Sequence, residues 1–515
     1  MKEHYDVVIV GSGMGGLVAA NILAREGKSV CVLEKNNQFG GNLQTFVRDK
    51  AIFDTGVHYL GGLSEGQNLY RYFDYLGILD GLVLKKLDES GFDIITFDDD
   101  ETEYPHAQGY ENFENSLIAQ FPEEEKAIKM YTAKLRDTCE KFPLYNLKTG
   151  KPYYEDSDIF SFPAKQYIDS LTGNEKLRAV LAGSNLLYAG DAEKSPFYVH
   201  ALSVNSYIES AYRCADGGSQ ITKLLIRRLK EHGGKAYKHQ EVIAFDVIDK
   251  KVVSVTTVNG NVIKGDIFIA NIEPKTTVKL VGTEHFRKSF NNRIEAIEST
   301  ISAFSIHIVL KPESFKYLNK NYYHFKNLDA VWNGHKYTQE SWPETYMVSM
   351  GVRKNQDEWG EQLTAISYMN YDEVTPWANT FNTVAQKNSR GETYEEFKAA
   401  KTETFLIELE KKFPDIRECI QSIHTSTPLS YRDYIGCNRG SMYGYVKDVE
   451  NPLKSFISPR TRIPNLLFTG QSLNMHGILG VTISGVLTCS EILGGDYLLN
   501  KIVSRAPDNN EKIIV

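Results

Sequence analysis

A glycine-rich turn inside a βαβ unit constrains this chain more than any other feature. Residues 5–10 (YDVVIV) form a continuous apolar stretch, typical of a buried parallel strand. The next residues, GSGMGG, have the spacing G-x-G-x-x-G and lead into 14–26, where apolar side chains recur at helical spacing. A second apolar strand within 27–35 ends on Glu34. A strand, a glycine turn, a helix and an acid in this order predict a dinucleotide-binding fold.

Each glycine of the turn has a physical task. Gly11 permits the tight turn, Gly13 lets the backbone approach a pyrophosphate, and Gly16 allows the helix to pack closely on the strand. Unpaired N–H groups at the start of the helix favour phosphate binding. Glu34 can accept hydrogen bonds from ribose hydroxyls, and its charge disfavours a 2′-phosphate.

Composition and charge exclude several classes of function. The chain has 515 residues, 42% hydrophobic and 24% charged, which is typical of a globular protein with a sizeable core. Its net charge is −8 and it has no Lys/Arg cluster, so we expect no nucleic-acid partner. The six cysteines are scattered without a C-x-x-C pair, which argues against a metal site or a disulfide framework and indicates a reducing compartment.

The start of the chain and its hydropathy predict a cytoplasmic protein. MKEHYDVVIV runs directly into a strand and leaves no room for a signal peptide. No window approaches the roughly 18 apolar residues of a transmembrane helix. At most, we expect a peripheral contact with a membrane surface.

The residues after Glu34 favour a flavin over a nicotinamide dinucleotide. A second glycine pair, Gly40–Gly41, lies just beyond the acid, and residues 51–62 (AIFDTGVHYLGG) then bring His58 and further glycines toward the same cleft. A nicotinamide dehydrogenase would continue with another regular strand–helix unit. This chain instead inserts a long segment and returns with three strands in 241–271, whose turns are predicted at Asp249–Lys250 and Asn259–Gly260. We therefore expect FAD.

These segments predict an α/β fold with two discontinuous, interleaved domains. The first is a Rossmann-like, glutathione-reductase-like FAD-binding domain with an antiparallel β-meander, built from residues 1–67, 211–299 and 440–515. The second is an α+β substrate-binding domain built from residues 68–210 and 300–439, where helices alternate with short strands.

Several segments together carry a resemblance to a known family. They are GSGMGGLVAANILAREGKSVCVLEKN with its following GG, FDTGVHYLGG, SPFYVHALSVNSYIESAYRCADGGSQI, STPLSYRDYIGCNRGSMYG and NLLFTGQSLNMHGILGVTISGVLTCSEIL. In this order the chain resembles the phytoene desaturase superfamily of FAD-dependent oxidoreductases, closest to its retinol saturase and carotenoid isomerase branch. The resemblance covers nearly the whole chain. It implies a saturase- or desaturase-type enzyme that acts on carbon–carbon double bonds of a lipophilic polyene, retinoid-like or carotenoid-like, or of another long unsaturated lipid.

The resemblance also implies which residues hold FAD. The expected contacts are Gly11, Gly13, Met14, Gly15, Gly16, Glu34 and Lys35 for the ADP half, Gly40, Gly41 and Asn42 for the pyrophosphate and ribitol, Val242 for the adenine through its backbone, and Gly470, Gln471 and Gly480 for the ribitol and isoalloxazine. Two positions depart from the family. Asn42 stands where these families often carry a basic residue, and the QSL segment after Gly470 lacks the acid that many relatives place there, which leaves the contacts of Ser472 open.

Catalysis on a double bond beside a flavin needs few side chains beyond those that place the carbon. A protein acid or base can still move the second proton. Our candidates are His58, Tyr59 and His200, and Glu209, Tyr212, Arg432 and Tyr434 are further polar residues of the same regions. His58 ranks first because its motif lies beside the flavin in the family. His200 lies in an apolar helix and equally suits a hydrogen-bonded core histidine.

The electron partner and the direction of reaction stay open at this point. The chain has no second G-x-G-x-x-G, so we expect an external donor or acceptor: NAD(P)H, a quinone or O₂. One alternative is redox-neutral cis–trans isomerisation of a carotenoid with the same FAD. Another is a flavin amine oxidase, with Tyr431 and Tyr434 as an aromatic cage. A third is a non-catalytic carrier of flavin or lipid.

Overall fold

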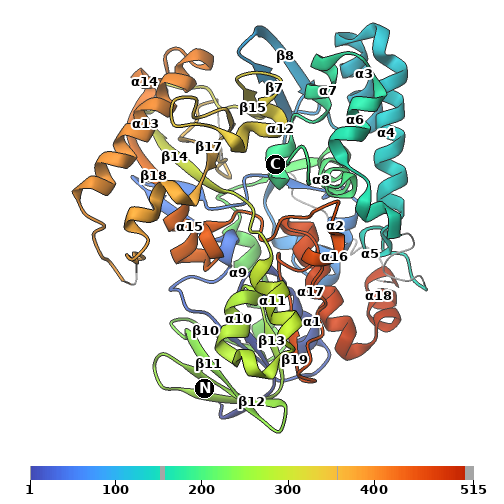
Figure 1. Ribbon diagram of the computed structural model, residues 1–515, viewed down its shortest axis with the longest axis vertical. Helices are drawn as coiled ribbons and strands as arrows, with labels where there is room; N and C mark the ends of the chain where they lie inside the picture. Colours follow the sequence, from blue (N-terminus) through green and yellow to red (C-terminus); the bar gives the residue numbers. More distant parts are fainter. Residues whose placement is uncertain (1, 151–156, 356–357, 385, 505–515) are drawn as a thin grey trace.

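The computed structural model describes residues 2–150, 157–355, 358–384 and 386–504. Within these ranges the chain forms two large sheets and a layer of helices (Figure 1). The last residues of the predicted segment 440–515, and short stretches of 68–210 and 300–439, lie outside the described residues. None of the described helices is long and apolar enough to cross a membrane.

The first sheet combines a parallel part with an antiparallel meander. In spatial order its strands are β10 (Lys235–Tyr237), β2 (Val30–Leu33), β1 (His4–Val10), β13 (Val262–Ala270), β12 (Lys251–Thr257) and β11 (Val242–Ile248), and β19 (Leu466–Phe468) also pairs with β13. The β1 strand runs parallel to both β2 and β13. Asp249 and Lys250 have φ of 50° and 62°, as the predicted β11–β12 turn requires. All these strands come from the three predicted segments of the dinucleotide domain.

One helix of this part is buried on all sides because it lies between other elements. The α1 helix (Met14–Arg25) is buried from Met14 to Ala24 and contacts both α9 (Ser219–Glu231) and α17 (Gly477–Leu493). The α17 helix approaches closely because Gly485 has no side chain: a Cβ there would lie 2.9 Å from the carbonyl oxygen of Gly15. Small residues therefore set the distance between the two helices.

The second sheet is buried on both faces of its five central strands, and its two edge strands are partly exposed. In spatial order its strands are β18 (Ile420–Ser426), β14 (Ser302–Leu310), β17 (Gln362–Met369), β16 (Thr345–Ser349), β15 (Asn321–Phe325), β7 (Asp93–Phe97) and β8 (Asp100–His106). The α13 helix (Glu392–Lys412) packs Phe405 and Leu409 against it. The β7 strand pairs in parallel with β15, although the two are far apart in the chain. All these strands come from the two segments predicted for the substrate domain.

A layer of helices lies beside the second sheet, at the upper right of Figure 1. It contains α3 (Tyr110–Gln120), α4 (Glu125–Glu140), α6 (Ala164–Leu171) and α8 (Phe197–Glu209). The α8 helix buries a face that includes Phe197, Ala201 and Ile208. Ala211, which the helical spacing places on the same face, instead begins β9 (Ala211–Cys214), because Ser210 is extended with φ of −170°.

Candidate cofactor cleft and apolar cavity

The carboxyl ends of four parallel strands meet at one cleft. Gly11, Glu34, Asn271 and Thr469 directly follow β1, β2, β13 and β19, and all four line this cavity, which we call the dinucleotide cleft. Ligands of open parallel sheets bind at this edge. Strand order alone therefore gathers residues from three distant parts of the chain around one site.

The glycine turn at the cleft is closed by an asparagine. Gly11 has φ of +95°, and a Cβ at Gly16 would lie 2.5 Å from the carbonyl oxygen of Gly11. The Asn271 side chain donates from Nδ2 to the carbonyl oxygens of Gly11 (3.2 Å) and Gly13 (3.3 Å). Asn271 is not among the residues predicted from the sequence. Its position directly after the buried strand DIFIA could have indicated a residue of the cleft.

Glu34 is buried and held in place by the turn that it faces. Its side chain accepts hydrogen bonds from Ser12 N–H (3.1 Å), Ser12 Oγ (2.5 Å) and Asn36 N–H (2.9 Å). A carboxylate offers about four acceptor sites, so one remains for a ribose hydroxyl. The position and capacity of Glu34 fit a dinucleotide.

The two departures from the family contact each other in the cleft. Asn42 donates from Nδ2 to Oε1 of Gln471 at 3.3 Å, and both side chains line the cavity with Ser472. An uncharged amide pair thus stands at these positions. Nearby, Thr469 Oγ1 is buried without a partner among the described residues, which leaves a polar group for a ligand. The glycine turn, the acid and this hydroxyl all fit a dinucleotide cofactor.

Most predicted cofactor residues line the dinucleotide cleft, and three do not. Those in its wall are Gly11, Gly13, Met14, Glu34, Lys35, Gly40, Gly41, Asn42, Val242, Gly470 and Gln471. Gly15 and Gly16 act as packing positions: a Cβ at Gly15 would lie 3.1 Å from Cα of Gly470. Gly480 lines a neighbouring cavity, and a Cβ there would lie 2.7 Å from Cβ of Met475.

A buried acid stands behind Tyr59 at the other end of the cleft. The Tyr59 hydroxyl donates to Oδ2 of Asp93 at 2.8 Å and lies 2.6 Å from the hydroxyl of Tyr323. Asp93 is fully buried, and its Oδ1 accepts from Nδ2 of Asn321 at 2.8 Å. Tyr59, Tyr323 and Tyr207, whose ring is tilted against that of Tyr59, line the cleft. We call Tyr59, Tyr323 and Asp93 the tyrosine–aspartate cluster.

The electrostatics of this cluster suit proton transfer. Burial raises the pKa of Asp93 to about 7, while hydrogen bonds from Asn321 and Tyr59 and the charge of Arg213 act in the opposite direction. Burial and the adjacent Asp93 hold the pKa of Tyr59 well above its usual value, so its hydroxyl keeps its proton. An acid that titrates near neutral pH is thus connected to the cleft through a tyrosine O–H.

The two predicted histidines have different surroundings. His58 lines the dinucleotide cleft, and burial together with the charge of Arg213 lowers its pKa to about 4, so the ring is neutral. His200 is fully buried in α8: Nε2 lies 2.7 Å from the Tyr131 hydroxyl and Nδ1 lies 2.9 Å from the Tyr188 hydroxyl. It lines neither the cleft nor the apolar cavity described below, so the structure separates it from His58 and Tyr59.

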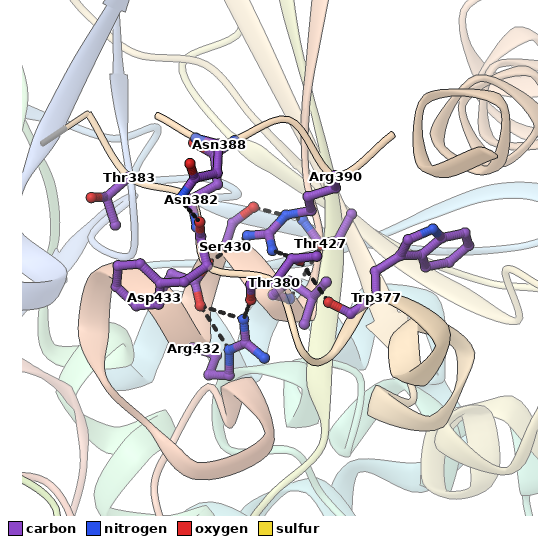
Figure 2. Close-up of polar contacts among 12 residues, drawn as sticks. Trp377, Thr380, Asn382, Thr383, Asn388, Arg390, Thr427, Ser430, Arg432 and Asp433 are labelled. Carbon is purple, nitrogen blue, oxygen red and sulfur yellow. Dashed lines mark hydrogen bonds and ion pairs between the residues drawn. The ribbon is translucent and has the colours of Figure 1, made fainter. Parts of the chain in front are cut away.

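A buried ion-pair network fixes the helix that carries two tyrosines of the cleft. Tyr431 and Tyr434 lie on α15 (Pro428–Ile435), and Figure 2 shows Asp433 of this helix between Arg390 and Arg432. The Arg390 guanidinium donates to Oδ2 of Asp433 at 2.5 Å, and Arg432 donates to Oδ1 at 2.7 Å. Arg432 thus anchors α15. Of our other proton-transfer candidates, Tyr434 lines the cleft, and neither Glu209 nor Tyr212 does so.

An apolar cavity of about 460 Å³ adjoins the dinucleotide cleft, a size usual for small-molecule sites. Residues of α2 (Asn68–Leu76), α5 (Pro143–Asn146), α8 and α17 supply half of its wall. The two cavities share the residues Leu187, Tyr207, His476, Gly477 and Ile478. Leu453 of α16 (Pro452–Ser455) also lines the apolar cavity and is 80% exposed, so the cavity reaches the surface beside this short helix.

Comparison with known proteins agrees with this architecture. Residues 9–76 match the family described as an NAD(P)-binding Rossmann-like domain. The chain is 26% identical to the all-trans-retinol 13,14-reductase of Danio rerio over 96% of this chain and 86% of that protein. It is 24% identical to the chloroplastic prolycopene isomerase 1 of an Oncidium hybrid cultivar, over 97% and 85%. The chain is thus similar along nearly its whole length to both of these enzymes.

Solved structures support the same fold. A putrescine oxidase variant superimposes with a TM-score of 0.63 at 16% identity, covering 98% of this chain and 99% of that chain. At this identity the likeness concerns the fold alone. The predicted fold class, a Rossmann-like dinucleotide domain interleaved with a second α+β region, is confirmed.

Proposed function

We propose that this protein binds FAD and saturates a carbon–carbon double bond of a lipophilic polyene. The observation that carries the proposal is the wall shared by the dinucleotide cleft and the apolar cavity. A long apolar chain in the cavity would reach the cleft past Tyr207 and Ile478. The similarity to retinol 13,14-reductases along 96% of the chain supports a polyene substrate.

Different residues of the dinucleotide cleft would hold different parts of FAD. The glycine turn and the start of α1 would receive the pyrophosphate, and Glu34 would receive a ribose hydroxyl. The uncharged Asn42–Gln471 pair and the unpaired Thr469 hydroxyl would face the central part of the cofactor. When bound in reduced form, FAD supplies a hydride equivalent to one carbon of the double bond. An external reductant, NAD(P)H or a quinol, would regenerate it.

Saturation of a double bond also needs a proton at the second carbon, and Tyr59 is placed to donate it. Its O–H lies in the wall of the cleft, and Asp93 stands 2.8 Å behind it. When Asp93 is protonated it becomes the donor of this hydrogen bond, which frees the Tyr59 proton for the cleft. After Tyr59 gives up that proton to the substrate, Asp93 replaces it. The hydride and the proton together add two hydrogens, so the reaction is balanced. We propose Tyr59 as the catalytic acid and Asp93 as its proton source.

Redox-neutral isomerisation of a polyene is the second candidate. The similarity to a prolycopene isomerase along 97% of the chain favours it. It would use the same cleft and cavity but leave the flavin in its starting redox state. Amine oxidation has less support, because the described wall of the apolar cavity holds a lysine and no acid to attract an ammonium group.

An anaerobic titration tests the proposal. The purified protein is loaded with FAD, reduced, and mixed separately with all-trans-retinol, a carotene and an unsaturated fatty acid while the visible absorbance of oxidised flavin is followed. We expect at least one of these lipids to reoxidise the flavin. A protein that binds no FAD, or whose reduced flavin is reoxidised by none of them, would contradict the proposal. Loss of the starting isomer without reoxidation would favour the isomerase.

A further inference from the structure

One cationic side chain interrupts the apolar cavity. Lys447 lies in its wall, and among the described wall residues it is the one lysine or arginine; no aspartate or glutamate is present there. Its Nζ donates to the carbonyl oxygens of Leu473 (3.1 Å) and Ser455 (3.3 Å). No ion pair joins it to an acid within the described part of the chain. A third N–H of the ammonium group is therefore left without a protein acceptor.

Two further polar groups lie at the same corner of the cavity. Asn474 directly follows Leu473, whose carbonyl oxygen accepts a hydrogen bond from Lys447. The Oδ1 atom of Asn474 is buried without a partner among the described residues. His476 lines both cavities, and its Nε2 lies 3.0 Å from the carbonyl oxygen of Leu187. Burial lowers the pKa of His476 to about 4, so this ring is neutral. We call Lys447, Asn474 and His476 the polar corner.

An ammonium group in such surroundings is costly without a counter-ion. Burial lowers the pKa of Lys447 to about 8, so the group remains mostly charged at neutral pH. Carbonyl oxygens solvate a charge but do not neutralise it, and an anion in a poorly hydrated cavity would interact with it strongly. Other lysines of the chain form ion pairs with acids: Nζ of Lys336 lies 3.7 Å from Oε1 of Glu193, and Nζ of Lys194 lies 2.7 Å from Oε2 of Glu298. The missing counter-ion of Lys447 points to a ligand.

We propose that the substrate is a long unsaturated chain with a carboxylate at one end, and that Lys447 binds this carboxylate while the chain occupies the apolar cavity. This inference rests on the proposed function, since it specifies the substrate of the same site. A carboxylate terminus would pair with the Lys447 charge. An alcohol terminus would instead donate its hydroxyl to Asn474 Oδ1 and leave the Lys447 charge unpaired. Lys447 bonds to Ser455 of α16, beside which the cavity opens, so the carboxylate end would lie there and the chain would extend toward the wall shared with the dinucleotide cleft.

The test compares three ligands that differ only at one terminus: all-trans-retinoic acid, its methyl ester and all-trans-retinol. Binding to the FAD-loaded enzyme is measured by quenching of the intrinsic fluorescence. We expect the acid to bind about 10–100-fold more tightly than the ester, as for a hydrogen bond to a charged group. Lys447→Met should abolish that preference and leave ester binding within about twofold. Lys336→Met, which removes an exposed and paired lysine, is the matched control and should keep it.

Three outcomes would overturn the inference. They are equal binding of acid and ester to the wild-type enzyme, tightest binding of the alcohol, and a Lys447→Met variant that retains the preference. If Lys447→Met does not fold, Lys447→Gln takes its place, and the wild-type comparison is decisive without any variant. Reoxidation of the reduced flavin is recorded in parallel with carotene and with all three ligands. Its absence throughout contradicts the proposed function, whereas reoxidation without preference for the acid contradicts only this inference.

Discussion

The two ends of the site are built by different means. At the dinucleotide end, backbone atoms form most of the site, since the glycine turn, the strand ends and the start of α1 make the cleft. The side chain of Asn271 holds the turn by donating to two of its carbonyl oxygens. At the end that we propose for the polyene, side chains from separate segments form the site, because Tyr59 contacts Asp93 of β7 and Tyr323 of β15. The first end tolerates almost no added atoms. The second depends on single hydroxyl and carboxyl groups.

The largest effect is expected where the backbone is most crowded. Gly16→Val would force a Cβ to within 2.5 Å of the Gly11 carbonyl oxygen. We expect the variant to lose bound FAD and roughly 1–3 kcal/mol of unfolding free energy. Flavin content per protein and thermal unfolding measure this. Gly173→Ala is the control, because nothing lies within 4 Å of its Cβ and its φ is ordinary. A Gly16→Val variant with full flavin content would show that the turn does not shape the cofactor site.

The next effect is expected at a single hydroxyl. Tyr59→Phe keeps the ring that contacts Tyr207 but removes the O–H proposed as proton donor. We expect normal flavin content and reoxidation by the polyene slower by about 10²–10⁴-fold. Stopped-flow absorbance measures this rate. Tyr104→Phe is the matched control, since it removes a buried tyrosine hydroxyl bonded to Asp100 at 3.1 Å, away from both cavities. Equal rates in both variants would exclude Tyr59 as the acid.

A smaller effect is expected from the acid behind that hydroxyl. Because the pKa of Asp93 is raised to about 7, we expect the wild-type rate of substrate reduction to fall as the pH rises through about 7. Asp93→Asn should lower the rate roughly tenfold and flatten this profile, because the tyrosine keeps a hydrogen-bond partner but loses its proton source. Rates measured across the pH range decide this. A titration near pH 7 that persists in Asp93→Asn would assign it to another group.

The same carboxyl group makes a second, thermodynamic prediction. Its folded pKa of about 7 lies above the ordinary value of 3.8, so the folded protein binds an extra proton between these pH values. Stability that this group contributes is therefore present at low pH and is lost as the pH rises from about 4 to about 7. Denaturant unfolding should show this loss in the wild-type protein relative to Asp93→Asn. Parallel pH profiles of the two proteins would contradict the raised pKa.

The smallest catalytic effect is expected at His200. Both ring nitrogens bond to buried tyrosines, so His200→Gln should cost about 1–3 kcal/mol of unfolding free energy and leave the reduction rate within about twofold. His58→Gln, on the wall of the cleft, is the comparison and should change the rate more than the stability. A large loss of rate in His200→Gln, at full flavin content, would return this residue to the catalytic candidates.

The contrast between a cleft built from backbone and a cluster built from side chains also explains which parts of the site can be predicted from the sequence. The glycine turn, Glu34 and the β11–β13 meander are local patterns, since spacing and turn residues within short windows determine them. The tyrosine–aspartate cluster is not local: Asp93 meets Asn321 because β7 pairs in parallel with β15, and no short-range pattern encodes this pairing. Helical spacing placed His200 on α8 but could not indicate the tyrosines around its ring. Lys447 carries no local signal, because its surroundings come from α16 and the loop before α17.

The central claim is that flavin and polyene exchange two hydrogens across the shared wall. The most direct measurement is a single turnover without oxygen, in which reduced enzyme is mixed with one equivalent of polyene, the flavin is followed by absorbance and the lipid by mass spectrometry. We predict one lipid that has gained two hydrogens for each flavin reoxidised. A flavin that stays reduced while the lipid keeps its mass would contradict the account.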